Sequence, residues 1–376
     1  MARVLVTGGA GFIGRHVTSR LLAAGHDVIV YDALIDQVHQ GRPPEAVFDD
    51  PRVTFVRAQI TDRDALGAAL LEVDQVVHLA AEVGVGQSMY LVDRYVQANT
   101  GGTGLLLDLI VNTPAVEISK IVVASSMSIY GEGLYRCREH GLVAPDLRSA
   151  ADLQARRWEL SCPECGQDLL PVPTTETKEL KPSSVYAITK MDQELLCLAV
   201  GGAYGIDTTA VRYFNAYGPG QSLSNPYTGV AAIFISRLLN GQRPLVNEDG
   251  RQIRDFVHVE DVAAGTVAAL SAQGCAGQVF NLGSGQPISI YDLAVQLAAA
   301  VGRSDLTPQV LDQFRVGDIR HCWADISRSR ALLGYQPQHN LRRGGMDRLI
   351  EWARTQTAVD NVDAAAKELH DRGLVR

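Results

Sequence analysis

Long apolar runs and an excess of basic residues are both missing from this sequence. No stretch reaches about 18 consecutive apolar residues, so no membrane-spanning helix is expected. The start, Met1 to Val6, lacks the layout of a secretion signal, so we expect a cytoplasmic protein. Lys and Arg number 34 against 42 Asp and Glu. The resulting acidic balance argues against nucleic acid or an anionic membrane surface as the main partner, because both require a basic face.

Cysteine is scarce, and its placement indicates a metal site more than a disulfide framework. Of the six cysteines, three cluster between positions 137 and 165, in a reducing compartment if the chain is cytoplasmic. Cys137 and His140 form one Cys-x2-His pair, and Cys162 and Cys165 form a Cys-x2-Cys pair. Four such ligands with no open position predict structural zinc. The alternatives are free thiols beside a surface histidine, or a disulfide between Cys162 and Cys165.

Short apolar strands alternate with amphipathic helices along most of the chain. This pattern predicts an α/β fold with a doubly wound parallel sheet that is covered on both faces. Strands are expected at Arg3–Thr7, His26–Asp32, Val53–Val56, Gln75–His78, Ile121–Ser125, Thr208–Arg212 and Val279–Leu282. Helices are expected at Ile13–Ala24, Asp62–Leu71, Ser88–Val111, Ser149–Leu160, Ser184–Tyr204 and Asp261–Ala272.

A glycine pattern between the first strand and the first helix predicts a dinucleotide site. Gly8 permits a tight turn, Gly11 lets the backbone approach a pyrophosphate, and Gly14 allows close packing of helix on strand. The helix N-terminus supplies N–H groups and positive dipole for the phosphates. Asp32 ends the second strand, where a carboxylate grips ribose hydroxyls and repels a 2′-phosphate. The fold is therefore expected to be Rossmann-type, with NAD favoured over NADP.

Two segments interrupt the regular alternation and predict further domains. Residues 136–173 carry the cysteine cluster and are expected to form an inserted zinc-knuckle subdomain. From about Gly218 the pattern loosens into a smaller, interleaved region. We therefore predict an NAD-binding domain at 1–135, continued at 174–215 and 256–282, and a substrate-binding domain at 216–255 and 283–376.

A tyrosine and a lysine lie four residues apart in Tyr186-Ala187-Ile188-Thr189-Lys190, on one face of a predicted helix. A nearby cation favours the phenolate, so a tyrosine with an ordinary pKa of about 10 can act as a base near neutrality. The spacing is common by chance. Its combination with Ser126, which follows an earlier strand, makes it distinctive.

Together these motifs resemble the extended short-chain dehydrogenase/reductase family, and within it the nucleotide-sugar epimerases and dehydratases. The resemblance covers nearly the whole chain apart from residues 136–173. It implies a nucleotide-diphosphate sugar as substrate, NAD as cofactor, and Ser126, Tyr186 and Lys190 as the catalytic set. Tyr186 would deprotonate a sugar hydroxyl, usually at C4, Ser126 would bond the same oxygen, and Lys190 would hold the ribose and lower the tyrosine pKa.

The resemblance also implies the other contacts of the site. The expected cofactor-binding residues are Gly8, Gly11, Phe12, Ile13, Gly14, Asp32, Gln59, Ile60, Leu79, Ala80, Ala81, Asn99, Tyr186, Lys190 and Tyr213. The expected substrate-binding residues are Ser126, Ser128, Asn215, Arg254 and Arg315, the arginines because their planar fork pairs with phosphate oxygens. Gln59 departs from the family, which carries an adenine-binding Asp before the position of Ile60.

The residues after Ser126 imply which branch of the family the chain resembles. The 4,6-dehydratases carry an Asp-Glu pair there, and sugar-acid decarboxylases usually carry a glutamate, whereas this chain has Met127 and Ser128. The resemblance therefore implies an isomerase, a nucleotide-sugar 4-epimerase that works through a transient 4-keto sugar. A 4-ketoreductase and a non-enzymatic, NAD-sensing scaffold remain as alternatives.

The substrate and the oligomer are implied only by finer resemblance. Segments 86–90 and 220–229, with the cysteine-bearing insertion, look like those of enzymes that act on a dTDP-6-deoxyhexose such as dTDP-L-rhamnose. Val83, Val85 and Met89 would form an apolar wall that suits such a sugar. A UDP-glucose or UDP-galactose type of 4-epimerase stays open. The helices expected at 88–111 and 184–204 resemble those that pair in the family's dimer, so a homodimer is expected.

Overall fold

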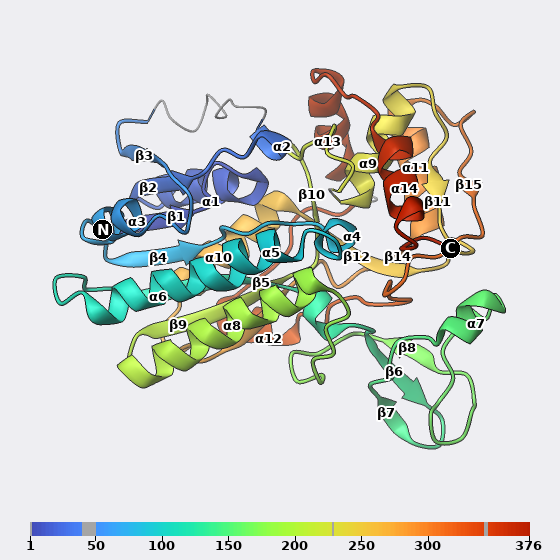
Figure 1. Cartoon of the computed structure of the whole chain (residues 1–376), viewed down its shortest axis with the longest axis horizontal. Coiled ribbons are helices and arrows are strands. Elements are labelled where there is room, and N and C mark those ends of the chain that lie inside the picture. Colours follow the sequence, from blue (N-terminus) through green and yellow to red (C-terminus); the bar gives the residue numbers. More distant parts are fainter. Residues whose placement is uncertain (1, 40–49, 228, 342–344) are drawn as a thin grey trace.

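A seven-stranded sheet, parallel throughout, lies at the centre of the computed structural model, which describes residues 2–39, 50–227, 229–341 and 345–376 (Figure 1). Its strands are β1 (Arg3–Thr7), β2 (Asp27–Asp32), β3 (Val53–Arg57), β4 (Gln75–His78), β5 (Lys120–Ser126), β9 (Asp207–Tyr213) and β13 (Val279–Leu282). Their order is β13-β9-β5-β4-β1-β2-β3. The order reverses between β1 and β4, and ligands of such sheets bind beyond the carboxyl ends of the strands at this switch point.

Helices cover both faces of the sheet, because neighbouring residues of each strand point to opposite sides. Val122 and Ala124 of β5 join one core, and Ile121 and Val123 join the other. The first core is covered by α1 (Phe12–Ala23), α10 (Val259–Ser271) and α12 (Ser327–Leu333). The second is covered by α3 (Arg63–Leu70), α6 (Gly102–Asn112) and α8 (Val185–Tyr204). The expected α/β fold with a large parallel sheet is confirmed.

The helix expected over Ser88–Val111 is interrupted in the structure. Its place is taken by α4 (Val85–Ser88), a turn, α5 (Val92–Tyr95), a π-helical segment (Val96–Gly101) and α6. The Ser88 hydroxyl donates to the Val85 carbonyl at 2.7 Å and accepts from the Tyr186 N–H at 3.0 Å. Side-chain bonds of this kind compete with a continuous helix. Ser88, at the break, thus provides a hydrogen-bond acceptor for the first turn of α8, where Tyr186 lies.

A smaller region packs beside the carboxyl ends of the sheet. It contains β10 (Asn215–Tyr217), α9 (Val230–Leu239), β11 (Leu245–Val246), β12 (Ile253–His258), β14 (Pro287–Ser289), α11 (Ile290–Val301), β15 (Gln309–Val310), α13 (Gly345–Arg354) and α14 (Val362–Asp371). Phe234, Leu293 and Leu349 belong to its own core. Ile319 and Tyr335, however, pack into the core of the large sheet, although they lie inside the range 283–376. The predicted domain division stays a prediction.

Residues 136–173 form a small unit that projects from the body near β14 (Figure 1). Strand β6 (Leu134–Cys137) pairs antiparallel with both β7 (Gly141–Val143) and β8 (Leu170–Val172). The helix expected over Ser149–Leu160 is shorter, α7 (Ala150–Gln154), because Arg156 takes a left-handed φ of 59°. None of the helices in the described part of the chain combines the length and apolarity that crossing a membrane requires.

Candidate active site

The glycine loop after β1 is shaped to hold a dinucleotide. Gly8 has a φ of +68°, and a Cβ there would lie 2.9 Å from the Ala80 nitrogen, in the segment that follows β4. A Cβ on Gly14 would lie only 2.2 Å from the Gly8 carbonyl oxygen. The N-cap of α1 is Gly11, which offers no side chain to cap the helix, and the first turn carries no acidic residue. This N-terminus is therefore suited to phosphate.

Asp32 lies at the carboxyl end of β2, beside the same loop. Its carboxylate accepts hydrogen bonds from the N–H groups of Ala10 at 3.1 Å and Leu34 at 2.9 Å. Helix α2 (Asp36–His39) follows directly, and His39 Nε2 lies 3.6 Å from the Asp32 carboxylate. A carboxylate fixed beside this loop would suit the ribose of a bound NAD, and the assignment of Asp32 to that contact stays a prediction.

Most of the other residues expected at the cofactor lie in three segments: 79–81, 59–60 and the start of α1. Leu79 and Ala80 donate backbone N–H bonds to Thr7, so the 79–81 segment runs alongside the loop. Ile60 packs against Gly102, and the carbonyl of Gln59 accepts from Tyr31. Phe12 and Ile13 begin α1.

Tyr213 is used differently from the expectation. Its hydroxyl bonds Thr266 of α10 at 2.8 Å, within the protein core, so the phenol does not face the site. Its backbone nevertheless lies beside Ser126, because β5 and β9 pair at these two residues.

Ser126, Tyr186 and Lys190 lie on two elements, β5 and α8, that pack against each other. Ser126 ends β5, and a single turn of 3₁₀ helix (Met127–Tyr130) places Ser128 beside it, with 2.9 Å between the two hydroxyl oxygens. Tyr186 and Lys190 lie in the first two turns of α8, whose N-cap Ser184 accepts from the Ala187 N–H. Ser126 lies close enough to the Tyr186 phenol to influence its pKa. Ser126 and Tyr186 therefore lie close together, and Lys190 follows Tyr186 one turn along the same helix.

The protonation of the pair depends on burial. Burial raises the pKa of the Tyr186 phenol, and Ser126 lowers it in part. Burial lowers the pKa of the Lys190 ammonium to about 7. In the chain alone, the lysine Nζ donates to Gln193 Oε1 at 2.6 Å. The lowering of the tyrosine pKa by Lys190 stays a prediction for the enzyme with its cofactor bound.

A buried polar network behind the site was not found from the sequence. Asn99, in the π-helical segment, donates to Thr189 at 3.0 Å and exchanges bonds with the Glu82 backbone. Gln193 donates to Thr103 at 2.9 Å while accepting from Lys190. Asn99 was expected from the resemblance. Gln193 lies one helical turn beyond Lys190, and that spacing could have identified it.

The residues expected at the substrate differ in burial and in their hydrogen-bond partners. Asn215 begins β10, and its side-chain oxygen is buried without a hydrogen-bond partner. Such an atom costs free energy unless a ligand satisfies it, so it fits a substrate contact. The Arg254 guanidinium in β12 donates to the carbonyls of Ile319 and Arg320 and to Asp318. Arg315 is exposed and pairs through its backbone with Val375.

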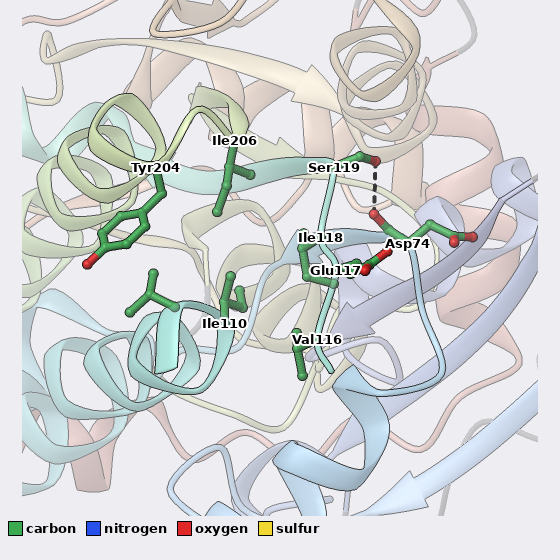
Figure 2. Close-up of a pocket in the computed structure, with 9 residues that line it drawn as sticks. Asp74, Ile110, Val116, Glu117, Ile118, Ser119, Tyr204 and Ile206 are labelled. Atoms are coloured by element: carbon green, nitrogen blue, oxygen red, sulfur yellow. Dashed lines mark hydrogen bonds between the residues drawn. The ribbon is translucent and has the colours of Figure 1, made fainter. Parts of the chain in front are cut away.

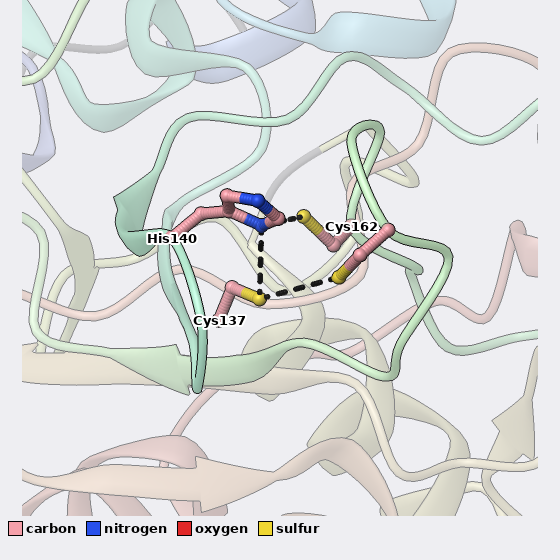
Figure 3. A group of neighbouring side chains, drawn as sticks. Cys137, His140 and Cys162 are labelled. Carbon is pink, nitrogen blue, oxygen red and sulfur yellow. Dashed lines mark hydrogen bonds between the residues drawn. The ribbon is translucent and has the colours of Figure 1, made fainter.

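The four predicted metal ligands lie together in the insertion (Figure 3). Their ligand atoms all lie within 4.8 Å of one another. Nδ1 of His140 is 3.6 Å from Sγ of Cys137 and 3.5 Å from Sγ of Cys162, and Sγ of Cys137 is 3.6 Å from Sγ of Cys165. A tetrahedral zinc with Zn–S of about 2.3 Å requires edges of roughly 3.6 to 3.8 Å. The three cysteines are free of disulfides, and with His140 they form a set of ligands that fits zinc.

The backbone around this cluster supports the same chemistry. Each pair is followed by a glycine in a left-handed conformation, Gly141 and Gly166, so the two knuckles turn alike. Hydrogen bonds from the backbone N–H groups of His140 and Glu139 lower the pKa of the Cys137 thiol to about 6. Its thiolate, the form that binds metals, is therefore favoured near neutrality.

A surface depression of about 500 Å³ lies elsewhere on the sheet (Figure 2). It is lined by Asp74, Ile110, Val111, Val116, Glu117, Ile118, Ser119, Tyr204 and Ile206. Asp74, Ser119 and Ile206 directly precede β4, β5 and β9. The depression therefore lies at the amino ends of the strands, on the opposite edge from Ser126 and the glycine loop, and it takes no part in the site.

Comparison with known proteins agrees with this geometry. The model of the NAD-dependent epimerase/dehydratase family matches residues 4–146 and 156–283. The chain belongs to this family. A dTDP-L-rhamnose 4-epimerase from Burkholderia thailandensis is 39% identical over 345 residues, which cover 91% of this chain and 92% of that protein. A dTDP-glucose 4,6-dehydratase from Streptomyces antibioticus is 30% identical over 359 residues, covering 94% of this chain and 93% of that protein.

A solved structure extends the likeness to three dimensions. The UDP-glucuronic acid 4-epimerase from Bacillus cereus, in complex with UDP-glucuronic acid and NAD, has a TM-score of 0.76 and 28% identity, covering 94% of this chain and 99% of that chain. The expectations of an extended short-chain dehydrogenase/reductase, of an epimerase-type enzyme and of NAD as cofactor are confirmed. The family match skips residues 147–155, which lie within the insertion.

Gly14 offers a test of how the loop holds the cofactor. Gly14→Ala places a methyl group 2.2 Å from the Gly8 carbonyl, so the loop must move. We expect a loss of about 1–3 kcal/mol in the free energy of unfolding, as for an overpacked site. The fraction of NAD that remains bound after gel filtration should also fall.

The matched control is Gly104→Ala in α6, where a Cβ meets nothing within 4 Å. It should leave NAD retention unchanged and stabilise the protein by up to about 1 kcal/mol, since alanine favours helix. Urea unfolding and NAD content measure both effects. If the Gly14 variant matches wild type in both, the assignment of the loop is wrong.

Proposed function

We propose that the chain is a nucleotide-sugar 4-epimerase whose catalytic residues are Ser126, Tyr186 and Lys190. The observation that carries the proposal is the closeness of the Tyr186 phenol, at the start of α8, to Ser126 at the carboxyl end of β5, with Lys190 one turn further along α8. Bound NAD supplies a hydride acceptor and, in the return step, a hydride donor. The proposed substrate is a nucleoside-diphosphate sugar, as the names of the relatives above indicate for those proteins.

Tyr186 acts as the base in this proposal. It takes the proton of the sugar C4 hydroxyl, and Ser126 donates a hydrogen bond to the same oxygen as it becomes a ketone. The buried ammonium of Lys190 favours the phenolate form once the ribose hydroxyls of the cofactor replace Gln193 as its partner. The 4-keto sugar then presents its other face before the hydrogen returns.

Epimerisation is favoured over water elimination by the residues next to Ser126. Positions 127 and 128 hold a methionine and a serine, so neither supplies the carboxylate that elimination needs. Glu132, the next carboxylate of this loop, is buried and accepts from the Arg320 N–H and the Tyr135 hydroxyl. A 4-ketoreductase is the second candidate, and NAD that stays bound through many turnovers without added reductant would exclude it.

The substrate proposed is a dTDP-6-deoxyhexose such as dTDP-L-rhamnose. The support is the 39% identity to the Burkholderia enzyme over most of both chains. Val83 and Val85 are exposed on either side of Gly84, at the segment that follows β4. Such apolar side chains suit a sugar without a 6-hydroxyl group. Ser128, Asn215, Arg254 and Arg315 are proposed to contact the sugar and its diphosphate.

A homodimer is part of the proposal. Val92 and Val96 on the α5 side and Ile188 and Leu195 on α8 are exposed apolar residues on helices that contact each other. Several exposed apolar side chains on packed helices are expected at a protein interface. A cytoplasmic location stays a prediction.

Turnover by the wild-type protein and by Tyr186→Phe tests the catalytic assignment. The phenylalanine keeps the ring that packs edge-on against Tyr95 but removes the base. We expect inversion of dTDP-L-rhamnose at C4 by the wild type without added reductant, a loss of at least about 10²-fold in kcat for the variant, and unchanged NAD content. UDP- and GDP-sugars are run in parallel, and undiminished turnover by the variant would exclude Tyr186 as the base.

Structural zinc at Cys137, His140, Cys162 and Cys165 is also proposed. The insertion has a small apolar core around Tyr135 and Leu160, so a metal would contribute much of its stability. We expect about one zinc per chain by elemental analysis. Cys162→Ser should lower the zinc content below half of this, whereas Cys275→Ser, a buried cysteine elsewhere, should not. Wild-type protein purified without chelator that contains no zinc would refute the site.

A further inference from the structure

The insertion meets the rest of the protein through buried charges. Arg148 and Glu159 belong to the insertion, and Glu248, Asp249 and Arg320 belong to the body. The side chain of Arg148 is 3% exposed, and that of Arg320 is fully buried. Charges are rarely buried unless they pair, so this contact is a specific one.

Arg148 is held on two sides by the body. Its two terminal nitrogens donate to the two carboxylate oxygens of Glu248 at 2.8 and 2.9 Å, a bidentate pair. One of them also donates to the Asp318 carbonyl at 3.2 Å. The insertion is thereby bonded directly to the backbone of Asp318.

Glu159 makes the second charged contact between the insertion and the body, with Arg320 and His321. One of its carboxylate oxygens accepts from the guanidinium of Arg320 at 2.5 and 3.1 Å, and the other lies 2.9 Å from Nε2 of His321. Arg320 is paired at the same time with Asp249 and with Glu248. The segment 318–321 is thus fixed by the insertion at both of its ends.

The same segment orients Arg254, an arginine proposed to hold the substrate diphosphate. The Arg254 guanidinium donates to the carbonyl oxygens of Ile319 at 2.6 Å and Arg320 at 2.9 Å, and to the Asp318 carboxylate at 3.3 Å. If residues 318–320 shift, these three acceptors shift with them. The direction of the guanidinium therefore depends on contacts that the insertion makes.

We propose that Arg148 is a positioning residue for the substrate diphosphate, and that the insertion acts through it and Glu159 to aim Arg254. The inference rests on the proposed function, because it takes Arg254 as a diphosphate contact. It assigns the insertion a role in substrate affinity without any contact between the insertion and the reacting sugar. The chemistry at Tyr186 is then unaffected by the insertion.

Arg148→Met in the NAD-loaded enzyme tests the proposal. The substitution keeps the apolar stem of the side chain but removes both bonds to Glu248 and the bond to Asp318. We expect the KM for the nucleotide sugar to rise at least about tenfold, with kcat within about twofold and NAD content unchanged. A variant that merely loses stability would lower kcat and leave KM near the wild-type value, which would overturn the proposal.

The matched control is Arg157→Met. Arg157 belongs to the same insertion, but it is 63% exposed and its guanidinium pairs with Asp152 of the insertion itself. It should have wild-type KM and kcat. Glu159→Gln is the milder second variant if Arg148→Met does not fold, because Glu159 is half exposed, and it should raise KM in the same direction.

Calorimetric titration with dTDP, and with thymidine as the probe that lacks phosphate, separates this proposal from the proposed reaction. Affinity for dTDP should fall in Arg148→Met while the weak affinity for thymidine does not change. Unchanged dTDP affinity overturns the positioning role and leaves the assignment of Tyr186 intact. Lost dTDP affinity in a protein that fails to invert any sugar keeps the positioning role and rejects the reaction. Wild-type protein that does not bind dTDP or UDP overturns the inference.

Discussion

The site depends on an ammonium group that the protein buries without a bonded carboxylate. Lys190 donates to the amide of Gln193, and the nearby Glu194 is already paired with Arg212. Burial therefore lowers the pKa of Lys190 to about 7, and its positive charge is poorly satisfied in the chain alone. Ribose hydroxyls and a phenolate on Tyr186 would both satisfy that charge. The same constraint thus favours binding of the cofactor and ionisation of the proposed base.

The cofactor side and the substrate side of the site are positioned by different parts of the fold. The parallel sheet brings the ends of β1, β2 and β5 to one edge, so the glycine loop, Asp32 and Ser126 are placed by the fold itself. The substrate side relies instead on loops and on the small region, where Arg254 is aimed by backbone carbonyls. Loops are more mobile than the strands and helices that they connect, so these loops need further contacts to keep Arg254 in place. The charges of the insertion contribute to this support, and the proposed zinc would stabilise the insertion in turn.

The parts of the site that the sequence predicts are local ones. Gly8, Gly14 and Asp32, and likewise Tyr186 and Lys190, owe their geometry to spacing along one strand–helix unit or one helix. The partners Arg148 and Glu248 are 100 residues apart, and only the tertiary fold brings them together. The break in the helix predicted at 88–111 depends on a bond from Tyr186, on another helix. The inward turn of Tyr213 depends on Thr266 in the same way.

In the proposed mechanism, the hydrogen at C4 leaves the sugar and returns to it within one binding event. The most direct measurement uses dTDP-L-rhamnose deuterated at C4, turned over in ordinary water and analysed by NMR and mass spectrometry. We expect the 4-epimer to retain the deuterium at C4, because a bound NAD would accept it from one face of the sugar and return it to the other. Replacement of the label by solvent hydrogen would contradict the account, because it would mean that the configuration changes by proton exchange.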